Sequence, residues 1–358
     1  APSPGRPAPS ASGTPRERFE RAVALSGADP AGAAALFDAA FRADPSLLYA
    51  AYDAGVLYER LGDLGRARDA YGRALAAAPG FEPASLNLSR LRLRTGQAEE
   101  AEADLRARVA AHPDQVGLRN QLVEVLLATG RLDAAEQEAR RILKSDEQNI
   151  QAMVNLATAY HRKGRYELAR MVLENARQVA PGDPVVWNHL GLVELQLGTR
   201  AQAMEQFRKA AELGESYPEA QINYGAMLVE TEAFPDAVKH LELAVKHAPR
   251  SAAAHLNLGN AYRGAKEFEK AEGAYQRALE IDPKLADAWF DLGLLYLDGE
   301  KPGLATAARL EKAIALLDRY AAEGGADPKL SQYRRDASTL LDKERKRLAR
   351  EEKERLRK

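Results

Sequence analysis

The chain has 358 residues, and its 51 lysines and arginines nearly balance its 52 aspartates and glutamates. A net charge of −1 excludes the strongly basic surface that non-specific nucleic-acid binding requires, and 46% hydrophobic residues exclude a wholly disordered chain. The absence of cysteine excludes disulfides, and no apolar run approaches the roughly 20 residues that a membrane-spanning helix needs.

The chain begins with the segment APSPGRPAPSASGTP, which consists almost entirely of Ala, Pro, Ser and Gly. Because such a segment cannot bury a core, we predict a flexible tether over residues 1–13. The sequence starts at Ala1 without methionine, and two interpretations stand. The chain is either an exported protein, processed at or just after a lipid-bearing cysteine, or a chain trimmed at its beginning.

From residue 14 to residue 320 the sequence repeats with a period of 34 residues. The repeats start at residues 14, 48, 82, 116, 150, 184, 218, 252 and 286. Their twentieth position is always alanine, namely Ala33, Ala67, Ala101, Ala135, Ala169, Ala203, Ala237, Ala271 and Ala305. From the second repeat on, the eighth position is small in seven of eight repeats, and the twenty-fourth position is often large and apolar.

Each repeat contains two apolar-periodic segments of helical phase, separated by a turn near its fifteenth position. In five repeats that position is glycine: Gly62, Gly96, Gly130, Gly164 and Gly198. We predict that each of these glycines ends a first helix in the left-handed conformation. Small residues at positions 8 and 20 then let the two helices of a repeat cross at close range.

The eighth repeat shows the full pattern, with Leu258, Gly259 and Tyr262 on its first predicted helix, followed by Ala271, Tyr275, Ala278 and Pro283. This pattern resembles the tetratricopeptide repeat (TPR) family, and the resemblance covers residues 14–320. It implies an all-α fold: a right-handed superhelix of about nine helix-turn-helix repeats plus a C-terminal capping helix. The first repeat fits better one residue out of step, and the ninth carries a small insertion before its second helix.

The sixth position of the repeats forms a column that we call the polar column, made of Asp53, Asn87, Gln121, Asn155, His189, Asn223, Asn257 and Asp291. The resemblance implies that first helices line a concave groove and that this position faces it. The column is similar to the asparagine ladder of O-linked N-acetylglucosamine transferase, whose carboxamides hold the backbone of a substrate peptide. The alternative is a polar face that is merely solvated.

Further residues predicted to line the groove are Asn260, Arg60, Arg94, Arg162 and Arg263. Arginines suit an acidic ligand segment, although exposed arginines are commonly only solvated. Some TPR domains clamp the C-terminal carboxylate of heat-shock chaperones with a lysine at the fifth position and an arginine at the sixth. No repeat here has either residue at those positions, so we expect no such clamp.

The sequence contains no phosphate-binding glycine loop, no His-Glu-x-x-His and no Gly-x-Ser-x-Gly motif. We therefore predict no catalytic residues, no metal site and no cofactor. Residues 327–358 predict a charged C-terminal helix whose first half caps the last repeat. Beyond Leu341 this helix is either solvated or a basic arm that touches anionic lipid or an acidic partner.

These features favour a non-catalytic scaffold that binds extended segments of other proteins in its concave groove. The Ala, Arg and Leu bias suggests a bacterium, in which tethered TPR proteins serve envelope machines for pili, secretins, export or gliding motility. We expect an exported protein of the periplasm or outer membrane, without nucleic-acid binding, that meets the membrane only through an N-terminal lipid tether. The alternatives are a docking or regulatory subunit of an enzyme such as a glycosyltransferase, and a cytoplasmic adaptor.

Overall fold

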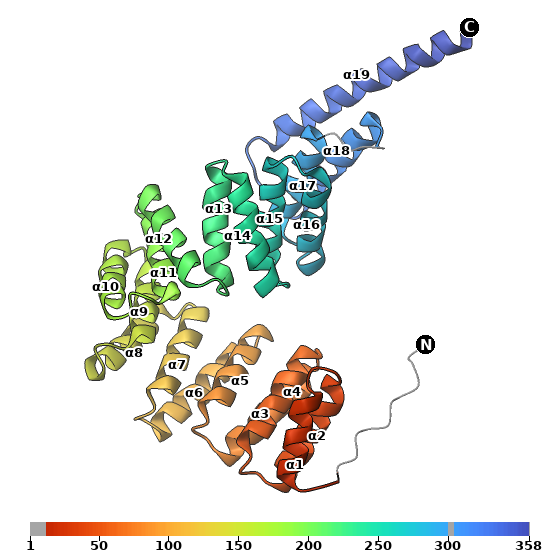
Figure 1. Ribbon diagram of the computed structural model, residues 1–358. Helices are drawn as coiled ribbons and strands as arrows, with labels where there is room; N and C mark the ends of the chain where they lie inside the picture. Colours follow the sequence, from red (N-terminus) through yellow and green to blue (C-terminus); the bar gives the residue numbers. More distant parts are fainter. Residues whose placement is uncertain (1–11, 300–303, 358) are drawn as a thin grey trace. The chain divides into compact units, whose positions relative to one another are not determined.

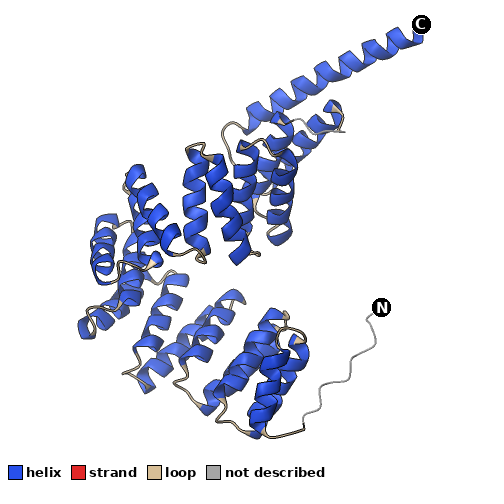
Figure 2. Ribbon diagram, viewed as in Figure 1, coloured by secondary structure: helices blue, strands red, loops and turns tan. Residues whose placement is uncertain are grey.

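The computed structural model describes residues 12–299 and 304–357. These residues form nineteen α-helices and no strand, joined by short turns (Figures 1 and 2). The all-α prediction is confirmed. The predicted tether over residues 1–13 lies almost wholly outside the described residues.

The helices fall into two compact units, one ending at Val179 and the other beginning at Ala180. Unit 1 contains α1 (Pro15–Leu25), α2 (Pro30–Ala43), α3 (Leu48–Arg60), α4 (Leu64–Ala77), α5 (Glu82–Arg94), α6 (Ala98–Ala111), α7 (Val116–Ala128), α8 (Leu132–Ser145), α9 (Ile150–Arg162) and α10 (Tyr166–Val179). Unit 2 contains α11 (Pro184–Gln196), α12 (Arg200–Leu213), α13 (Pro218–Glu230), α14 (Phe234–His247), α15 (Ala252–Gly264), α16 (Phe268–Ile281), α17 (Ala286–Asp298), α18 (Thr306–Ala322) and α19 (Leu330–Arg357).

Odd-numbered helices up to α17 are the first helices of repeats, and each packs against the even-numbered second helix that follows it. First helices of neighbouring repeats also lie side by side, as α5, α7 and α9 do in unit 1 and α11, α13, α15 and α17 do in unit 2. Second helices of neighbouring repeats show no comparably close pairing among the described residues. Within each unit, the first helices therefore form the more tightly packed face.

The crossing of the two helices within a repeat rests on very small residues. The position-20 alanines of the first eight repeats are completely buried, namely Ala33, Ala67, Ala101, Ala135, Ala169, Ala203, Ala237 and Ala271. The position-24 side chain of the second helix packs on the position-8 residue of the first. A Cβ added to Gly55 would lie 2.4 Å from the Tyr71 ring, and one added to Gly191 would lie 2.5 Å from the Phe207 ring. Only glycine permits this approach.

The ninth repeat departs from the column of buried alanines. Ala305 is exposed and precedes α18, so its predicted place in that column is wrong. Ala313, eight residues later, is completely buried, and Leu317 packs on Gly293 in the way that a position-24 residue does. The insertion predicted from the sequence moves the register of the second helix by eight residues.

Glycines at position 15 end five first helices as predicted. Gly62, Gly96, Gly130, Gly164 and Gly198 have φ between +70° and +79°, and each lies just beyond the end of its helix. In the left-handed region glycine avoids the steric cost that a Cβ brings.

Buried carboxylates on second helices join neighbouring repeats. Glu102 and Glu136 occupy the same repeat position and are 5% and 8% exposed. Glu102 accepts from Arg131 of the next repeat at 3.0 Å, and Glu136 accepts from Lys163 of the next repeat at 2.7 Å. The hydrogen bond from Lys163 lowers the pKa of Glu136 below its ordinary value of 4.5. Each pair is a brace between repeats in addition to their apolar contacts.

The last helix, α19, caps the array with its first half. Ala337 and Leu341 are buried against α18, whereas Leu348 is 43% exposed and Leu356 is 77% exposed. From residue 342 to residue 357 no residue of this helix is buried.

Replacing Ala169 with Leu should lower the free energy of unfolding by about 1–3 kcal/mol, because the crossing of α9 and α10 has no space for three more carbons. Urea denaturation followed by circular dichroism measures this change. Ala305→Leu is the matched control from the same sequence column, and its stability should stay within about 0.5 kcal/mol of wild type because Ala305 is exposed. Equal effects at both sites would contradict the assigned packing.

Replacing Glu136 with Gln should lower stability at pH 7 by about 1–2 kcal/mol, because Lys163 loses a charged acceptor. The folded-state pKa of Glu136 is depressed, so its contribution is present above pH 4.5 and is lost as pH falls through the folded pKa. The stability of wild type should therefore fall more steeply on acidification than that of the variant. Glu205→Gln is the control, since Glu205 pairs with Arg208 inside one exposed helix turn.

Candidate functional site

The polar column lies on the first helices, and two of its asparagines bond across neighbouring repeats. The Asn223 amide nitrogen donates to the side-chain oxygen of Asn188 at 2.8 Å, and the Asn155 amide nitrogen donates to that of Asn120 at 3.5 Å. Each bond joins residues 35 apart, which is one repeat plus one residue. A sixth-position residue therefore lies beside the fifth-position residue of the preceding repeat.

Two members of the polar column are buried in the free protein. Asn155 is 4% exposed, and its carbonyl oxygen accepts a hydrogen bond from Gln151 at 3.2 Å. Gln121 is 6% exposed, and its amide nitrogen donates to the Glu82 carbonyl at 3.2 Å. The expectation that the whole column faces water is wrong for these two residues, because side chains of adjacent positions and repeats cover them. They act as braces of unit 1.

Asn87 belongs to a polar cluster of unit 1 that also contains one predicted groove arginine. The Tyr71 hydroxyl donates to Glu59 at 2.7 Å, and the Asn87 amide nitrogen donates to the Tyr71 oxygen at 3.3 Å. Arg94 donates to the other oxygen of Glu59 at 2.7 Å. Burial raises the pKa of Tyr71 well above its ordinary value, so its hydroxyl stays protonated.

Unit 2 contains a similar cluster around a conformationally fixed amide. The Tyr275 hydroxyl donates to the Asn260 carbonyl oxygen at 2.6 Å, and Arg263 lies 3.7 Å from the carboxylate of Asp291. Burial raises the pKa of Asp291, while Arg263 and a hydrogen bond from Asn260 oppose that rise. The cluster holds Asn260 and Arg263 in fixed positions on α15.

The remaining column members make local contacts. His189 Nδ1 lies 2.9 Å from a carbonyl of its own helix, and burial raises the pKa of Asp53. Asn257 donates to the carbonyl of Ala253 at 3.0 Å, and its own side-chain oxygen accepts no hydrogen bond from the described residues. The fifth-position residue of the preceding repeat is Ile222, which has no polar side-chain atom. Asn257 is therefore a column amide that is available to a ligand.

The other two predicted groove arginines differ from each other. Arg162 donates to the Leu127 carbonyl of the preceding repeat, so it serves repeat packing. Arg60 is exposed and forms no ion pair with a described residue. Arg94 forms an ion pair with Glu59. Of the two groove arginines predicted in the second and third repeats, Arg60 is therefore the one without an ion pair to a described residue.

An aromatic cluster joins α3, the first helix of the second repeat, to Phe81, which directly precedes α5. Tyr49 is 57% exposed, and its ring centroid lies 6.1 Å from Tyr52 and 5.2 Å from Phe81. This cluster adds apolar surface to the first-helix face of unit 1.

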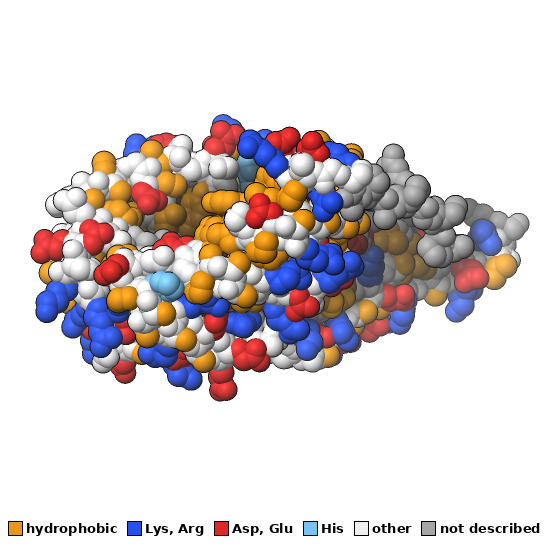
Figure 3. All heavy atoms as spheres, turned by 90° about the horizontal axis from the view of Figure 1, so that it is seen from below, with side chains coloured by type: hydrophobic (Ala, Val, Ile, Leu, Met, Phe, Trp, Pro, Cys, Tyr) orange, Lys and Arg blue, Asp and Glu red, His pale blue; other side chains and the backbone are white. Residues whose placement is uncertain are grey.

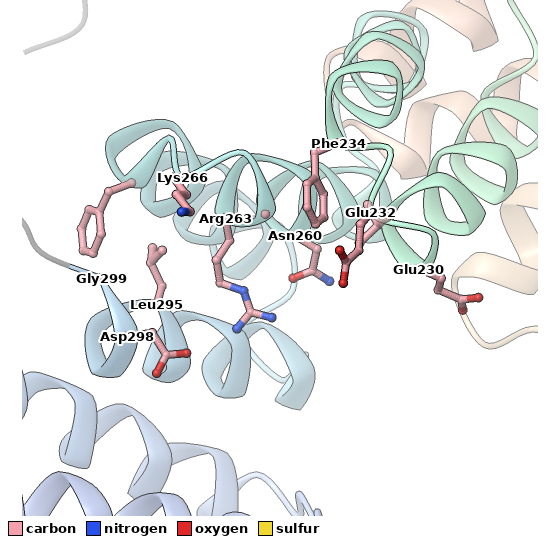
Figure 4. A pocket seen from close by; sticks show the side chains of 12 residues that line it. Glu230, Glu232, Phe234, Asn260, Arg263, Lys266, Leu295, Asp298 and Gly299 are labelled. Carbon is pink, nitrogen blue, oxygen red and sulfur yellow. The ribbon is translucent and has the colours of Figure 1, made fainter.

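A cleft of about 840 Å³ lies in unit 2, at the ends of α13, α15 and α17. Asn260 and Arg263 project into it from α15, and Figure 4 shows Arg263 directed toward α17, which carries Asp298. Phe234, with the neighbouring Glu232, borders one end. The structure thus brings two of the predicted groove residues together in one cavity.

The predicted groove residues do not include several residues of the cleft, among them Glu232, Lys266, Phe234 and Phe268. A signal was present, because Glu232 and Lys266 interrupt the position-15 glycine column in the seventh and eighth repeats. Phe234 and Phe268 follow two residues later in the same two repeats.

The surface carries both signs of charge. On the face seen in Figure 3, Lys and Arg side chains are interspersed with Asp and Glu, without an extended basic patch. Within the described ranges, no helix is both long and apolar enough to cross the bilayer, and no group of three His, Asp or Glu side chains is arranged to hold a metal ion.

Family models described as tetratricopeptide repeat match residues 20–80, 60–116, 126–192, 185–216, 252–285 and 274–315. The chain belongs to the tetratricopeptide repeat family. This confirms the resemblance that the repeat pattern indicated.

Three similar proteins illustrate the range of the family. Type IV pilus assembly protein PilF of Pseudomonas aeruginosa is 28% identical over 191 residues, covering 53% of this chain and 75% of PilF. Protein O-mannosyl-transferase TMTC1 of Homo sapiens is 27% identical over 260 residues, covering 73% of this chain but 25% of TMTC1. The Cut9–Hcn1 hetero-tetramer of APC/C has a chain that superposes with a TM-score of 0.60 at 18% identity, covering 89% of this chain and 62% of that one. The last likeness concerns the fold alone.

Asn155→Ala should lower the free energy of unfolding by about 1–3 kcal/mol, because it removes a buried carboxamide and leaves the side-chain oxygen of buried Asn120 without its donor. Asn257→Ala should stay within about 0.5 kcal/mol of wild type, because Asn257 is not buried and bonds only to its own helix. Thermal and urea denaturation of both variants measure the contrast. Equal stability of the two variants would show that the bonds across repeats contribute nothing.

Proposed function

We propose that this TPR chain is a non-catalytic scaffold that holds extended segments of partner proteins against its first helices. One observation carries the proposal: the first helices lie side by side, the column residues other than Gln121 and Asn155 stay partly exposed, and the side-chain oxygen of Asn257 accepts no hydrogen bond from the described residues. Packed helices lie about 8–10 Å apart, and an extended chain advances about 3.3 Å per residue. Neighbouring repeats therefore meet an extended ligand about three residues apart.

A carboxamide suits this task because it both donates and accepts hydrogen bonds. It can pair with the N–H and C=O of any peptide, so the ligand's side chains are free to be selected elsewhere. The clusters around Tyr71 and Tyr275 fix Asn87 and Asn260 before a ligand arrives, which reduces the entropy lost on binding.

We further propose that the partners belong to a bacterial envelope machine, such as one that assembles pili, and that the chain works in the periplasm or at the outer membrane. Support comes from PilF, which is named a pilus assembly protein and matches over three quarters of its length. A lipid tether before residue 12 would be its contact with the membrane.

A docking role beside an enzyme is the second candidate, favoured by the likeness to TMTC1, which is named an O-mannosyl-transferase. The chain matches a quarter of that protein. We propose that the repeats themselves perform no catalysis.

A photo-reactive amino acid at position 257, on α15, should cross-link to a partner protein in cells. The same probe at exposed position 277, on second helix α16, is the control and should give far less product. Mass spectrometry of the product identifies the partner and the cross-linked segment. Stronger cross-linking from position 277 would place the working surface on the second helices and overturn the proposal.

The double variant Asn87→Ala/Asn257→Ala should bind the purified partner about 30–100-fold more weakly, since each lost amide contact costs about 1 kcal/mol or slightly more. Its melting temperature should stay near wild type, in contrast to Asn155→Ala.

Fractionation of cells that express the full gene product separates the envelope proposal from a cytoplasmic adaptor. Recovery in the cytosolic fraction would contradict the envelope role.

A further inference from the structure

The cleft of unit 2 is bordered by two residues in a backbone conformation that the rest of the array reserves for glycine. Glu232 has φ +59° and Lys266 has φ +62°, whereas five other repeats use glycine at the equivalent position. An L-residue is less stable than glycine there because its Cβ crowds the backbone. Both residues line the cleft and are exposed. Strained residues that persist beside a cavity point to a function for their side chains.

The charges along the cleft alternate from repeat to repeat. The seventh repeat contributes Glu232, the eighth contributes Lys266 together with Arg263, and the ninth contributes Asp298 (Figure 4). Glu232, Lys266 and Asp298 form no ion pair with any described residue, so their charges are available to a ligand. The order across the three repeats is negative, positive, negative.

Apolar groups lie between these charges. The Phe234 ring packs so close to Gly264 that an added Cβ would lie 2.1 Å from it, and Phe268 packs in the same way on Gly299. Together with Leu295, these rings give the cleft an apolar lining between its charged side chains.

We propose that this cleft selects an extended peptide segment with a basic, an acidic and a basic residue at intervals of three, separated by apolar residues. The inference rests on the proposed function and names the ligand class for one part of the groove. The interval follows from the helix spacing of about 8–10 Å and the advance of about 3.3 Å per ligand residue. The charge order reads the same from both ends, so it holds for either direction of the bound chain.

The probe is a fluorescent nine-residue peptide with lysine at its second and eighth positions, glutamate at its fifth, and leucine and alanine elsewhere. The control peptide has glutamate at the second and eighth positions and lysine at the fifth. Fluorescence anisotropy with the wild-type protein should show at least about tenfold tighter binding of the probe, with a preference that shrinks as salt rises. Equal binding, or binding of neither peptide, would overturn the inference.

Glu232→Gly and Lys266→Gly are the decisive variants, because each restores the residue that the other repeats use. Each should raise the melting temperature and weaken binding of the probe by about tenfold. Gly198→Glu is the matched control, since it places a glutamate in the same conformation away from the cleft. It should lower the melting temperature and leave binding unchanged. If the glycine variants bind the probe as tightly as wild type, the side chains of Glu232 and Lys266 do not select the peptide.

The two proposals fail separately. If the cross-link from position 257 persists and Asn87→Ala/Asn257→Ala weakens partner binding, the scaffold function stands even where the two peptides bind alike. If that cross-link is absent while the peptides are discriminated, the cleft binds peptides and the polar column does not.

Discussion

The structure depends on the close crossing of the two helices within each repeat. In most repeats, a completely buried alanine of the second helix and a small residue of the first bring the backbones together, and a ring or leucine fills the remaining space. Each repeat contributes little core of its own, so stability accumulates through the interfaces between neighbours. Glycine recurs at the crossing because a Cβ added at Gly55, Gly191, Gly225 or Gly259 would lie 2.4–2.5 Å from the ring or leucine of the second helix.

Those neighbour interfaces also decide which polar side chains can serve a ligand. A sixth-position asparagine beside an asparagine of the preceding repeat turns inward and joins the repeats, as Asn223 does with Asn188. Beside the apolar Ile222, Asn257 bonds to its own helix and keeps an open acceptor. One column thus contains members that join repeats, such as Asn155 and Gln121, and members such as Asn257 that bond only within their own helix.

The fold was readable from the sequence because its causes are local and repeated. The 34-residue period, the alanine column and the position-15 glycines each have one structural explanation, and nine copies reinforce it. Ala305 shows the limit of this prediction. The sequence reveals an insertion in the ninth repeat, but the register of the second helix depends on which later alanine packs against α17. Tertiary contacts bury Ala313 in that place. The burial of Asn155 was equally out of reach, since it arises from a partner 35 residues away.

The cleft of unit 2 shows how an array tolerates locally unfavourable residues. The two repeats that place Glu232 and Lys266 in the left-handed region are also the two that carry phenylalanine two residues later. Each phenylalanine packs on a glycine of the next repeat, Gly264 or Gly299, and buries ring surface at that interface. Since stability is shared between neighbours, this added contact offsets the backbone strain beside it. The strained positions therefore need not be repaired by glycine, and their side chains remain available to the cleft.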